Sequence, residues 1–196
     1  MTGIILAGGE NRRMGSEKSF LVVAGKPLIE HIIAVHRKLF DTTIVVTRSP
    51  ERYRGYPVVV VEDAMDLRGP LTGIYSGMLR SSDECHFVSA CDMPFMNPRL
   101  IEYLAAQIEG YDAVVPRLNG MAEPLHAVYH RRLLPLIENC LKARRQKVQS
   151  LFERAKVRYV ADDEIGSIDP EKRSFKNVNT PQEYKEALCS DLACRN

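Results

Sequence analysis

Short apolar runs alternate with helix-like stretches along most of this chain, and this alternation limits the fold more than any single residue does. The runs at residues 4–7, 42–47, 58–61, 87–90 and 112–116 are rich in apolar or β-branched side chains, as is typical of buried strands. Residues 58–61 are four consecutive valines, which predicts a fully buried strand of the parallel kind. Strands separated by helices form βαβ units, so the sequence predicts an α/β fold with a mainly parallel central sheet flanked by helices.

The helix-like stretches begin with residues that favour helix starts. The first has Pro27 in its first turn, and its apolar positions 28, 29, 32, 33, 35 and 39 fall mostly on one face. Residues 69–79 open with Gly-Pro and predict a second helix. Asn97 is a suitable N-cap for a third, with Pro98 in its first turn. These helices would form the crossovers between parallel strands.

The second half of the chain is less regular. Its expected elements are extended segments at 123–130 and 175–179, a helix at 131–141, and a strand at 157–160. Residues 180–183 (Thr-Pro-Gln-Glu) have the form of a capping box and predict a C-terminal helix over 181–188. No repeat or linker is visible, so we expect a single domain over residues 1–196.

A glycine-rich loop follows the first predicted strand. Within residues 8–18 its glycines and cations are Gly8, Gly9, Gly15, Arg12, Arg13 and Lys18. Glycine lets backbone N–H groups approach a ligand closely, and fixed cations complete an anion cradle. The spacing fits neither the P-loop, which needs Lys directly after its second glycine, nor the G-x-G-x-x-G fingerprint. The loop therefore predicts a polyphosphate site of another type, with a solvated glycine-rich turn as the alternative.

Two carboxylates follow predicted strands, Asp92 after residues 87–90 and Asp63 after residues 58–61. In open α/β sheets ligands bind at the carboxyl ends of the strands, where the glycine loop also begins. Asp92 is placed to hold Mg²⁺, which typically takes one or two carboxylates plus substrate phosphates. The alternative is a strand-end Asp that caps the next turn. Asp63 is a candidate to contact the nucleotide sugar or the metal, or else an exposed loop acid.

Further candidate residues lie in the second half. Asn177 and Asn179 precede the capping box and are candidates to support the metal or the phosphates, although Asn also favours turns. Among the histidines, His126 is the one expected near a substrate. Cys91 adjoins Asp92, but a small apolar strand residue is the better account of it because no base is paired with it in the sequence.

Composition narrows the functional class. The chain has 27 Lys plus Arg against 25 Asp plus Glu, a net charge of +2, which gives no basis for a nucleic-acid or membrane partner. The basic run at 142–147 is the usual sign of a solvated helix end. The five cysteines include no C-x-x-C pair, so reduced thiols in a cytoplasmic protein are expected. The first apolar run is too short for a signal peptide or a membrane span.

The motifs, taken in order, resemble those of the molybdenum cofactor guanylyltransferases, the MobA-type members of the nucleotidyltransferase superfamily. They are Leu6-Ala7-Gly8-Gly9-x-x-x-Arg13-Met14-Gly15-x-x-Lys18, Gly25-Lys26-Pro27-Leu28, Gly69-Pro70-Leu71-x-Gly73-Ile74, Cys91-Asp92-Met93-Pro94 and Asn177-Val178-Asn179-Thr180-Pro181. The resemblance covers essentially the whole chain. Asn11, Glu17 and Gln182 depart from the family pattern, which usually has Ser, Asp and an acid there.

The resemblance implies a Rossmann-like three-layer sandwich, with a nucleotide-binding N-terminal half and a pterin-facing C-terminal part. It also implies GMP transfer from GTP to the terminal phosphate of molybdopterin, with Mg²⁺ as cofactor and release of pyrophosphate. In residue terms, the base and ribose would meet Leu6, Ala7, Gly8 and Gly9, and the phosphates Arg13 and Lys18, with Arg12 beside them. Asp63 would contact the nucleotide and Asp92 the metal, while Asn177, Asn179 and His126 would lie on the pterin or phosphate side. Arg13, Lys18 and Asp92 would be the catalytic set.

Alternatives remain at this point. A CTP-dependent molybdopterin cytidylyltransferase and a sugar-phosphate nucleotidyltransferase share the Leu-Ala-Gly-type start, although Gly8-Gly9 favours guanine by resemblance. A non-catalytic nucleotide-binding regulator belongs to a different class. For the guanylyltransferase, cofactor-insertion and molybdoenzyme-maturation proteins are the expected protein partners.

Overall fold

The computed structural model describes residues 1–8, 18–65, 67–183 and 185–186. Its strands are β1 (Thr2–Leu6), β2 (Val22–Val23), β3 (Lys26–Pro27), β4 (Thr42–Val46), β5 (Val59–Val61), β6 (Cys85–Ala90), β7 (Ala113–Leu118), β8 (Met121–Ala122), β9 (His126–His130) and β10 (Val157–Val160). Its α-helices are α1 (Leu28–Leu39), α2 (Pro70–Arg80), α3 (Pro98–Ala106), α4 (Leu134–Lys142), α5 (Gln149–Phe152) and α6 (Asp162–Ile168). Short 3₁₀ turns are η2 (Lys18–Phe20), η3 (Pro50–Tyr53), η4 (Arg131–Leu133) and η5 (Arg173–Phe175).

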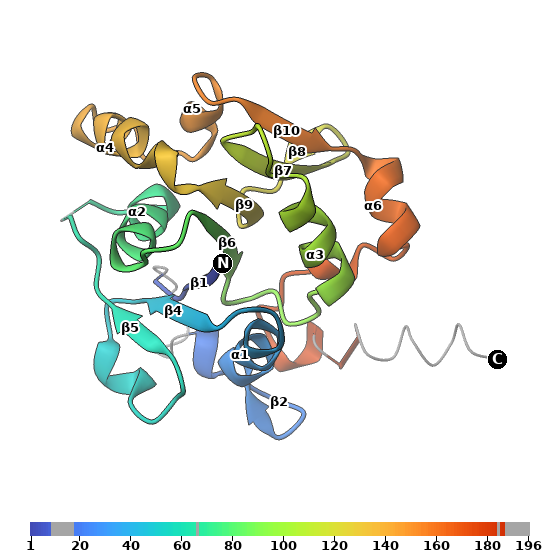
Figure 1. The fold of residues 1–196 in the computed structure, drawn as a ribbon. Helices are drawn as coiled ribbons and strands as arrows, with labels where there is room; N and C mark the ends of the chain where they lie inside the picture. The colour runs from blue at the N-terminus through green and yellow to red at the C-terminus, as the bar shows by residue number, and fades with distance from the viewer. Residues whose placement is uncertain (9–17, 66, 184, 187–196) are drawn as a thin grey trace.

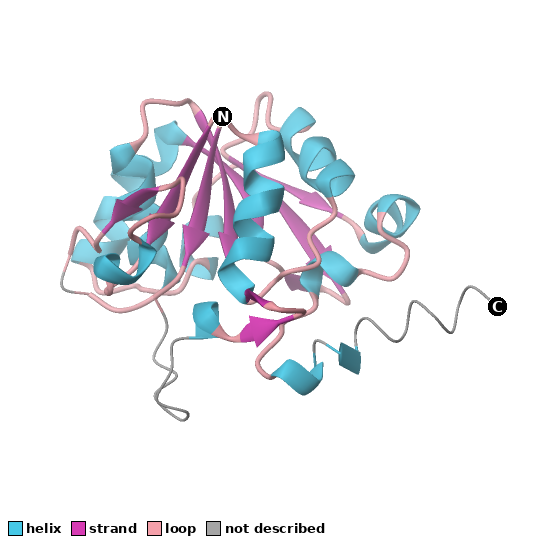
Figure 2. Ribbon diagram, turned by 90° about the horizontal axis from the view of Figure 1, so that it is seen from below, coloured by secondary structure: helices cyan, strands magenta, loops and turns pink. Residues whose placement is uncertain are grey.

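One sheet organises the chain, in the strand order β10-β7-β9-β6-β1-β4-β5, and β8 adds to it as a hairpin with β7 (Figures 1 and 2). β1 pairs in parallel with both β4 and β6, β4 with β5, and β7 with β10. β9 is antiparallel to its neighbours β6 and β7. The expected α/β class with a mainly parallel sheet is confirmed.

Two apolar cores lie on the two faces of this sheet. Alternate residues of a strand point to opposite faces, so Ile5 packs in the core with α1, α3 and α6, while Ile4 packs in the core with α2, α4 and α5. Figure 1 shows these helices in separate layers around the strands. The arrangement is the three-layer sandwich expected of a Rossmann-like fold.

Close packing of α2 on β1 fixes one side of the sheet edge. A Cβ at Gly77 would lie 2.7 Å from Cγ2 of Ile4, and one at Gly73 would lie 3.0 Å from Cδ2 of Leu6. Glycine at these positions lets the helix backbone approach the strand. The first turn of α2 therefore sits beside the end of β1, where the glycine loop begins.

Two helix caps expected from the sequence are present. Oδ1 of Asn97 accepts from the backbone N–H of Arg99 at 3.0 Å, so Asn97 caps α3. Oγ1 of Thr180 accepts from the backbone N–H of Glu183 at 3.1 Å, and residues 181–183 and 185–186 are helical. The rest of the predicted C-terminal helix, residue 184 and residues 187–188, lies outside the described residues.

Three local predictions are wrong. The valine run at 58–61 does not form the fully buried strand that was expected. Its strand, β5, is the last of the order, and all three of its residues are partly exposed, because an edge strand is covered less completely than a central one. Pro27 belongs to β3 and precedes α1 as its N-cap residue, so it does not lie in the first turn. Phe175 belongs to the 3₁₀ turn η5, and the extended segment begins after it.

In the part of the chain that the structure describes, no helix combines the length and apolar character needed to cross a bilayer.

Candidate active site

The carboxyl ends of β1 and β6 form the centre of the candidate site. These strands are adjacent and parallel, with Leu6 opposite Ala90, and the backbone N–H of Cys91 donates to the Leu6 carbonyl at 3.1 Å. Gly8 and Asp92 therefore emerge side by side from the same edge. In Figure 2 the arrowheads of the central strands point toward the side that carries β2 and β3, which pair as a short antiparallel hairpin. The part of the expected convergence that the structure describes, that of Gly8 with Asp92, thus follows from the parallel pairing of β1 and β6.

Lys18 joins two predicted site residues from distant parts of the chain. Its Nζ lies 3.7 Å from Oδ2 of Asp92 and donates a hydrogen bond to Oδ1 of Asn179. Asn179 is 161 positions away in the sequence. A cation, a carboxylate and an amide are thus brought together at the sheet edge, which is an arrangement suited to an anionic ligand with a bound cation.

Asp92 lies in a semi-enclosed environment. Its side chain is 20% exposed, and burial raises the pKa of its carboxyl, while the neighbouring Lys18 ammonium acts in the opposite direction. The backbone carbonyl of Asp92 accepts from the N–H of Val178 at 2.8 Å. Val178 is buried against Val23 and Leu28. The segment that carries Asn179 is therefore anchored directly to the strand end that carries Asp92.

Asp63 follows β5 on the same side of the sheet, but it lies in a separate polar group. Nε of Arg48 donates to Oδ2 of Asp63 at 3.3 Å. The next residue, Ala64, donates its N–H to Oγ of Ser76 at 2.8 Å, and this ties the Asp63 loop to α2. The structure thus places Asp63 two strands away from β1, beside a guanidinium and not beside Lys18.

The predicted cradle residues differ in how they are presented. Gly9, Arg12 and Arg13 lie outside the described residues, whereas Gly8 is exposed. Ala7 is buried in the core with α1. The Leu6 side chain packs in the core with α2. A ligand at this edge would therefore meet mainly Gly8, since Ala7 is 1% exposed and its backbone N–H already donates to the Val46 carbonyl.

The expectation that His126 lies near a substrate is wrong for this structure. His126 is fully buried in β9, where its ring packs edge-on against Phe87 (centroids 5.0 Å apart) and Phe175 (4.9 Å). Burial lowers the pKa of His126 to about 3. The residue is part of the core because β9 lies inside the sheet between β7 and β6, with both of its faces covered, so that residues 126–129 are all buried.

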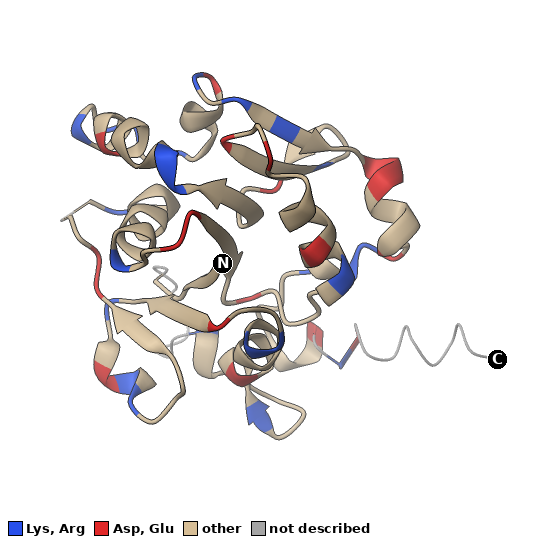
Figure 3. Cartoon of the chain, viewed as in Figure 1, with Lys and Arg blue, Asp and Glu red and all other residues tan. Residues whose placement is uncertain are grey.

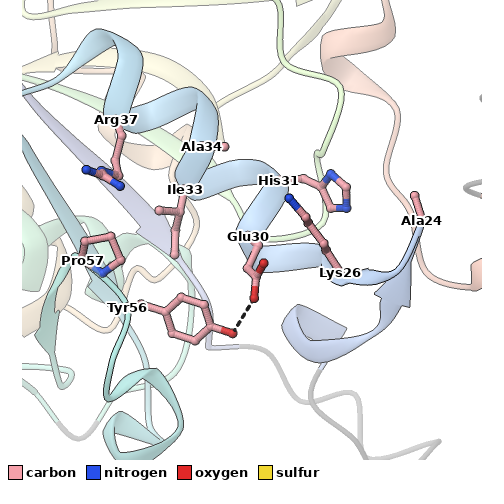
Figure 4. A pocket seen from close by; sticks show the side chains of 9 residues that line it. All are labelled: Ala24, Lys26, Glu30, His31, Ile33, Ala34, Arg37, Tyr56 and Pro57. Carbon is pink, nitrogen blue, oxygen red and sulfur yellow. Dashed lines mark hydrogen bonds between the residues drawn. The ribbon is translucent and has the colours of Figure 1, made fainter.

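Charge and cavities alone do not locate this site. Figure 3 shows both signs of charge on helices of both outer layers. A pocket of about 620 Å³ lies along the outer side of α1, between Lys26, Arg37 and Tyr56, whose hydroxyl donates to Glu30 at 3.3 Å (Figure 4). None of the predicted site residues lines it. The converging Lys18, Asp92 and Asn179 are a better indication of chemistry than the volume of this pocket, since pocket size does not report reactivity.

Comparison with known proteins agrees with this geometry. Residues 3–160 match the MobA-like NTP transferase domain. The chain belongs to this nucleotidyltransferase family.

Relatives of this MobA-like transferase cover its full length. It is 36% identical over 197 residues to a molybdenum cofactor guanylyltransferase of Desulfosudis oleivorans, covering 100% of this chain and 98% of the relative. A probable molybdenum cofactor guanylyltransferase of Pelotomaculum thermopropionicum is 36% identical, covering 95% and 91% of the two chains. The molybdopterin-guanine dinucleotide biosynthesis protein A of Archaeoglobus fulgidus superposes with a TM-score of 0.83 at 30% identity, covering 97% and 100%. The resemblance drawn from the motifs is confirmed.

Two features of this MobA-like transferase had no clear signal in its sequence. Arg48, which pairs with Asp63, follows a strand end like many surface cations. Glu183 was expected only as a capping residue, yet its Oε2 accepts from the backbone N–H of Asn179 at 2.6 Å. Its position three residues after Thr180 predicted a capping role. Its link to Lys18 through Asn179 could not be predicted, because it depends on how the C-terminal segment folds against the site.

Proposed function

We propose that this chain transfers GMP from GTP to the terminal phosphate of molybdenum-carrying molybdopterin, forming the guanine dinucleotide cofactor and releasing pyrophosphate. The observation that supports it most is the meeting of Lys18, Asp92 and Asn179 at the carboxyl edge of β1 and β6. The relatives named as guanylyltransferases across the full chain length support the choice of substrates. The substrates are therefore two phosphate compounds that must be held in line at one edge.

The proposed reaction is a displacement at the α-phosphorus. A terminal phosphate oxygen of molybdopterin forms the new P–O bond, the bond between the α-phosphorus and the bridging oxygen breaks, and pyrophosphate leaves with the electron pair. The nucleophile is already anionic, so the site needs little general-base function. Lys18, with Arg13 as a proposed second cation, would hold the phosphates and neutralise charge that develops on them. Positioning of the substrates and electrostatic stabilisation of the transition state are then the main sources of the rate enhancement.

The proposed cofactor is Mg²⁺, and Asp92 is the residue that would hold it. Within the described ranges, no group of three or more His, Cys, Asp or Glu side chains forms a metal cage. That fits an ion carried largely by the nucleotide phosphates, since Mg²⁺ in such sites uses one or two protein carboxylates. When bound, Mg²⁺ would supply charge neutralisation at the phosphates. The part of Lys18 is to keep the Asp92 carboxylate ionised, against the effect of burial on its pKa.

Asp63 is proposed to contact the base of the nucleotide. Leu6, Ala7, Gly8 and Gly9 are the other proposed contacts of the base and ribose. A carboxylate only accepts hydrogen bonds, and guanine presents two adjacent N–H donors on its pairing edge, whereas cytosine presents a donor beside an acceptor. Nε of Arg48 donates to Oδ2 of Asp63, which holds the carboxylate in place at the sheet edge. This favours guanine over cytosine in the proposal.

Asn177 and Asn179 form the proposed pterin or phosphate side. Both side chains are exposed, and Asn179 accepts from Lys18, the residue that is proposed to hold the phosphates. We further propose a single domain over residues 1–196, a cytoplasmic location, and delivery of the product to cofactor-insertion and molybdoenzyme-maturation proteins.

Pyrophosphate release tests this proposal. With molybdenum-loaded molybdopterin as acceptor and Mg²⁺ present, GTP should support release and CTP, ATP and UTP should not. Glucose 1-phosphate as acceptor should give no product. Preference for CTP would make the chain a cytidylyltransferase, product with glucose 1-phosphate would make it a sugar-phosphate enzyme, and retention of Mg·GTP without turnover on any acceptor would make it a regulator.

A further inference from the structure

The C-terminal helix is tied to the candidate site through a short series of hydrogen bonds. Oε2 of Glu183 accepts from the backbone N–H of Asn179 at 2.6 Å, and the Asn179 side chain accepts from Lys18. Lys18 in turn lies 3.7 Å from Asp92. We infer that Glu183 is a positioning residue, which holds Asn179 so that its amide oxygen orients Lys18 beside Asp92. The inference rests on the proposed nucleotidyl transfer, because it assigns a role within that site.

Glu183 is well fixed for this role. Its own backbone N–H donates to Oγ1 of Thr180 at 3.1 Å, so the Thr180 cap holds the first turn of the helix while the Glu183 carboxylate reaches back past it to Asn179. In the usual capping box this carboxylate meets the N-cap residue itself. Here it meets the residue before it, which is the one whose side chain contacts Lys18. The carboxylate of a capping residue thus supports the residue that contacts Lys18.

The other side of Asn179 is held independently. Val178 is 1% exposed, packs with Val23 and Leu28, and donates its N–H to the Asp92 carbonyl at 2.8 Å. This anchor fixes the backbone just before Asn179, and Glu183 fixes the N–H of Asn179 itself. A hydrogen bond that involves a charged group is stronger than a neutral one. Without it, the orientation of the Asn179 side chain is no longer restricted from the helix side.

The same helix contains a matched control. Glu186 has the same charge and accepts from Nε2 of Gln182 at 2.8 Å, a contact that stays within the helix surface. Removing either carboxylate changes the charge of this helix equally. Only the removal of Glu183 breaks the series of contacts that leads to Lys18.

The test measures kcat/KM for GTP-dependent pyrophosphate release in four single variants of the full chain. Glu183→Ala should lower it about tenfold, as expected for loss of one charge-assisted hydrogen bond. Glu183→Gln, which keeps an acceptor oxygen, should recover most of the loss. Glu186→Ala should stay within about twofold of wild type. Asn179→Ala provides the background for the coupling measurement.

Coupling between the two positions separates positioning from general stability. If Glu183 acts through Asn179, adding Glu183→Ala to Asn179→Ala should cost less than about twofold more, since neighbours in one network are not additive. Equal losses from Glu183→Ala and Glu186→Ala, or a full tenfold loss on the Asn179→Ala background, would overturn the inference. If wild type releases no pyrophosphate with GTP and molybdopterin, the proposed function itself fails, which is a different result from either of these.

Discussion

The buried His126 should make the stability of the protein depend on pH, and His126→Phe should remove the share of that dependence that comes from His126. Burial lowers the pKa of His126 from 6.5 to about 3, against a smaller opposing influence of Asp169. The folded protein therefore binds fewer protons at this site than the unfolded chain does between those pH values. Its contribution to stability is fully present above the unfolded pKa and is lost as the pH falls through this window.

The size of the effect follows from the two pKa values. For a group with pKa 6.5 unfolded and about 3 folded, the free energy of unfolding falls by about 2 kcal/mol between about pH 7.5 and about pH 5. His36, whose pKa burial also lowers to about 3, should add a similar amount. Phenylalanine suits the site of His126, since both ring neighbours are Phe and neither ring nitrogen has a hydrogen-bond partner among the described residues.

Urea unfolding monitored by circular dichroism at several pH values provides the measurement. His126→Phe should lose about 2 kcal/mol less than wild type between about pH 7.5 and about pH 5. Tyr129→Phe is the control from the same strand, because it removes the hydroxyl hydrogen bond to the Pro124 carbonyl (2.7 Å) and should cost about 1 kcal/mol at every pH tested. A variant at position 126 with the wild-type pH dependence would refute the assigned burial of a neutral imidazole.

Three further predictions concern the site and the packing beneath it. Asp92→Ala should abolish Mg²⁺-dependent pyrophosphate release, and near-normal release would contradict the metal assignment. Lys18→Ala should weaken GTP binding, measured by titration calorimetry, and lower turnover, each by about tenfold or more; unchanged binding would show that Lys18 does not contact the nucleotide. Gly3→Ala would overlap the rings of His36 and Phe40 and should lower the free energy of unfolding by about 2 kcal/mol. The control Gly166→Ala, with open space around it, should be neutral or stabilising by up to about 1 kcal/mol; equal effects of the two would contradict the packing.

The sequence was most informative where local chemistry and topology agree. Asn97 and Thr180 were recognisable as caps because capping depends on neighbours a few residues away. The closeness of Gly8 and Asp92 followed from placing both at carboxyl ends of parallel strands. These features depend on short-range patterns and on the general geometry of βαβ units.

Other features depend on contacts that no local pattern encodes. The position of β5 at the sheet edge follows from strand order, so four valines in a row could not show that the strand is partly exposed. The direction of β9, and with it the inward orientation of His126, depends on its pairing with β6 and β7. The contact of Lys18 with Asn179 joins residues 161 positions apart. Each of these features could be recognised only in the folded structure.

Base selectivity in the complete reaction tests the central claim most directly. The measurement is pyrophosphate release by the wild-type chain with molybdenum-loaded molybdopterin and each of GTP, CTP, ATP and UTP in turn, with Mg²⁺ present. We expect release with GTP and formation of the guanine dinucleotide, with both lost in Asp92→Ala. Equal release with all nucleotides, or release with GTP that Asp92→Ala leaves unchanged, would contradict it.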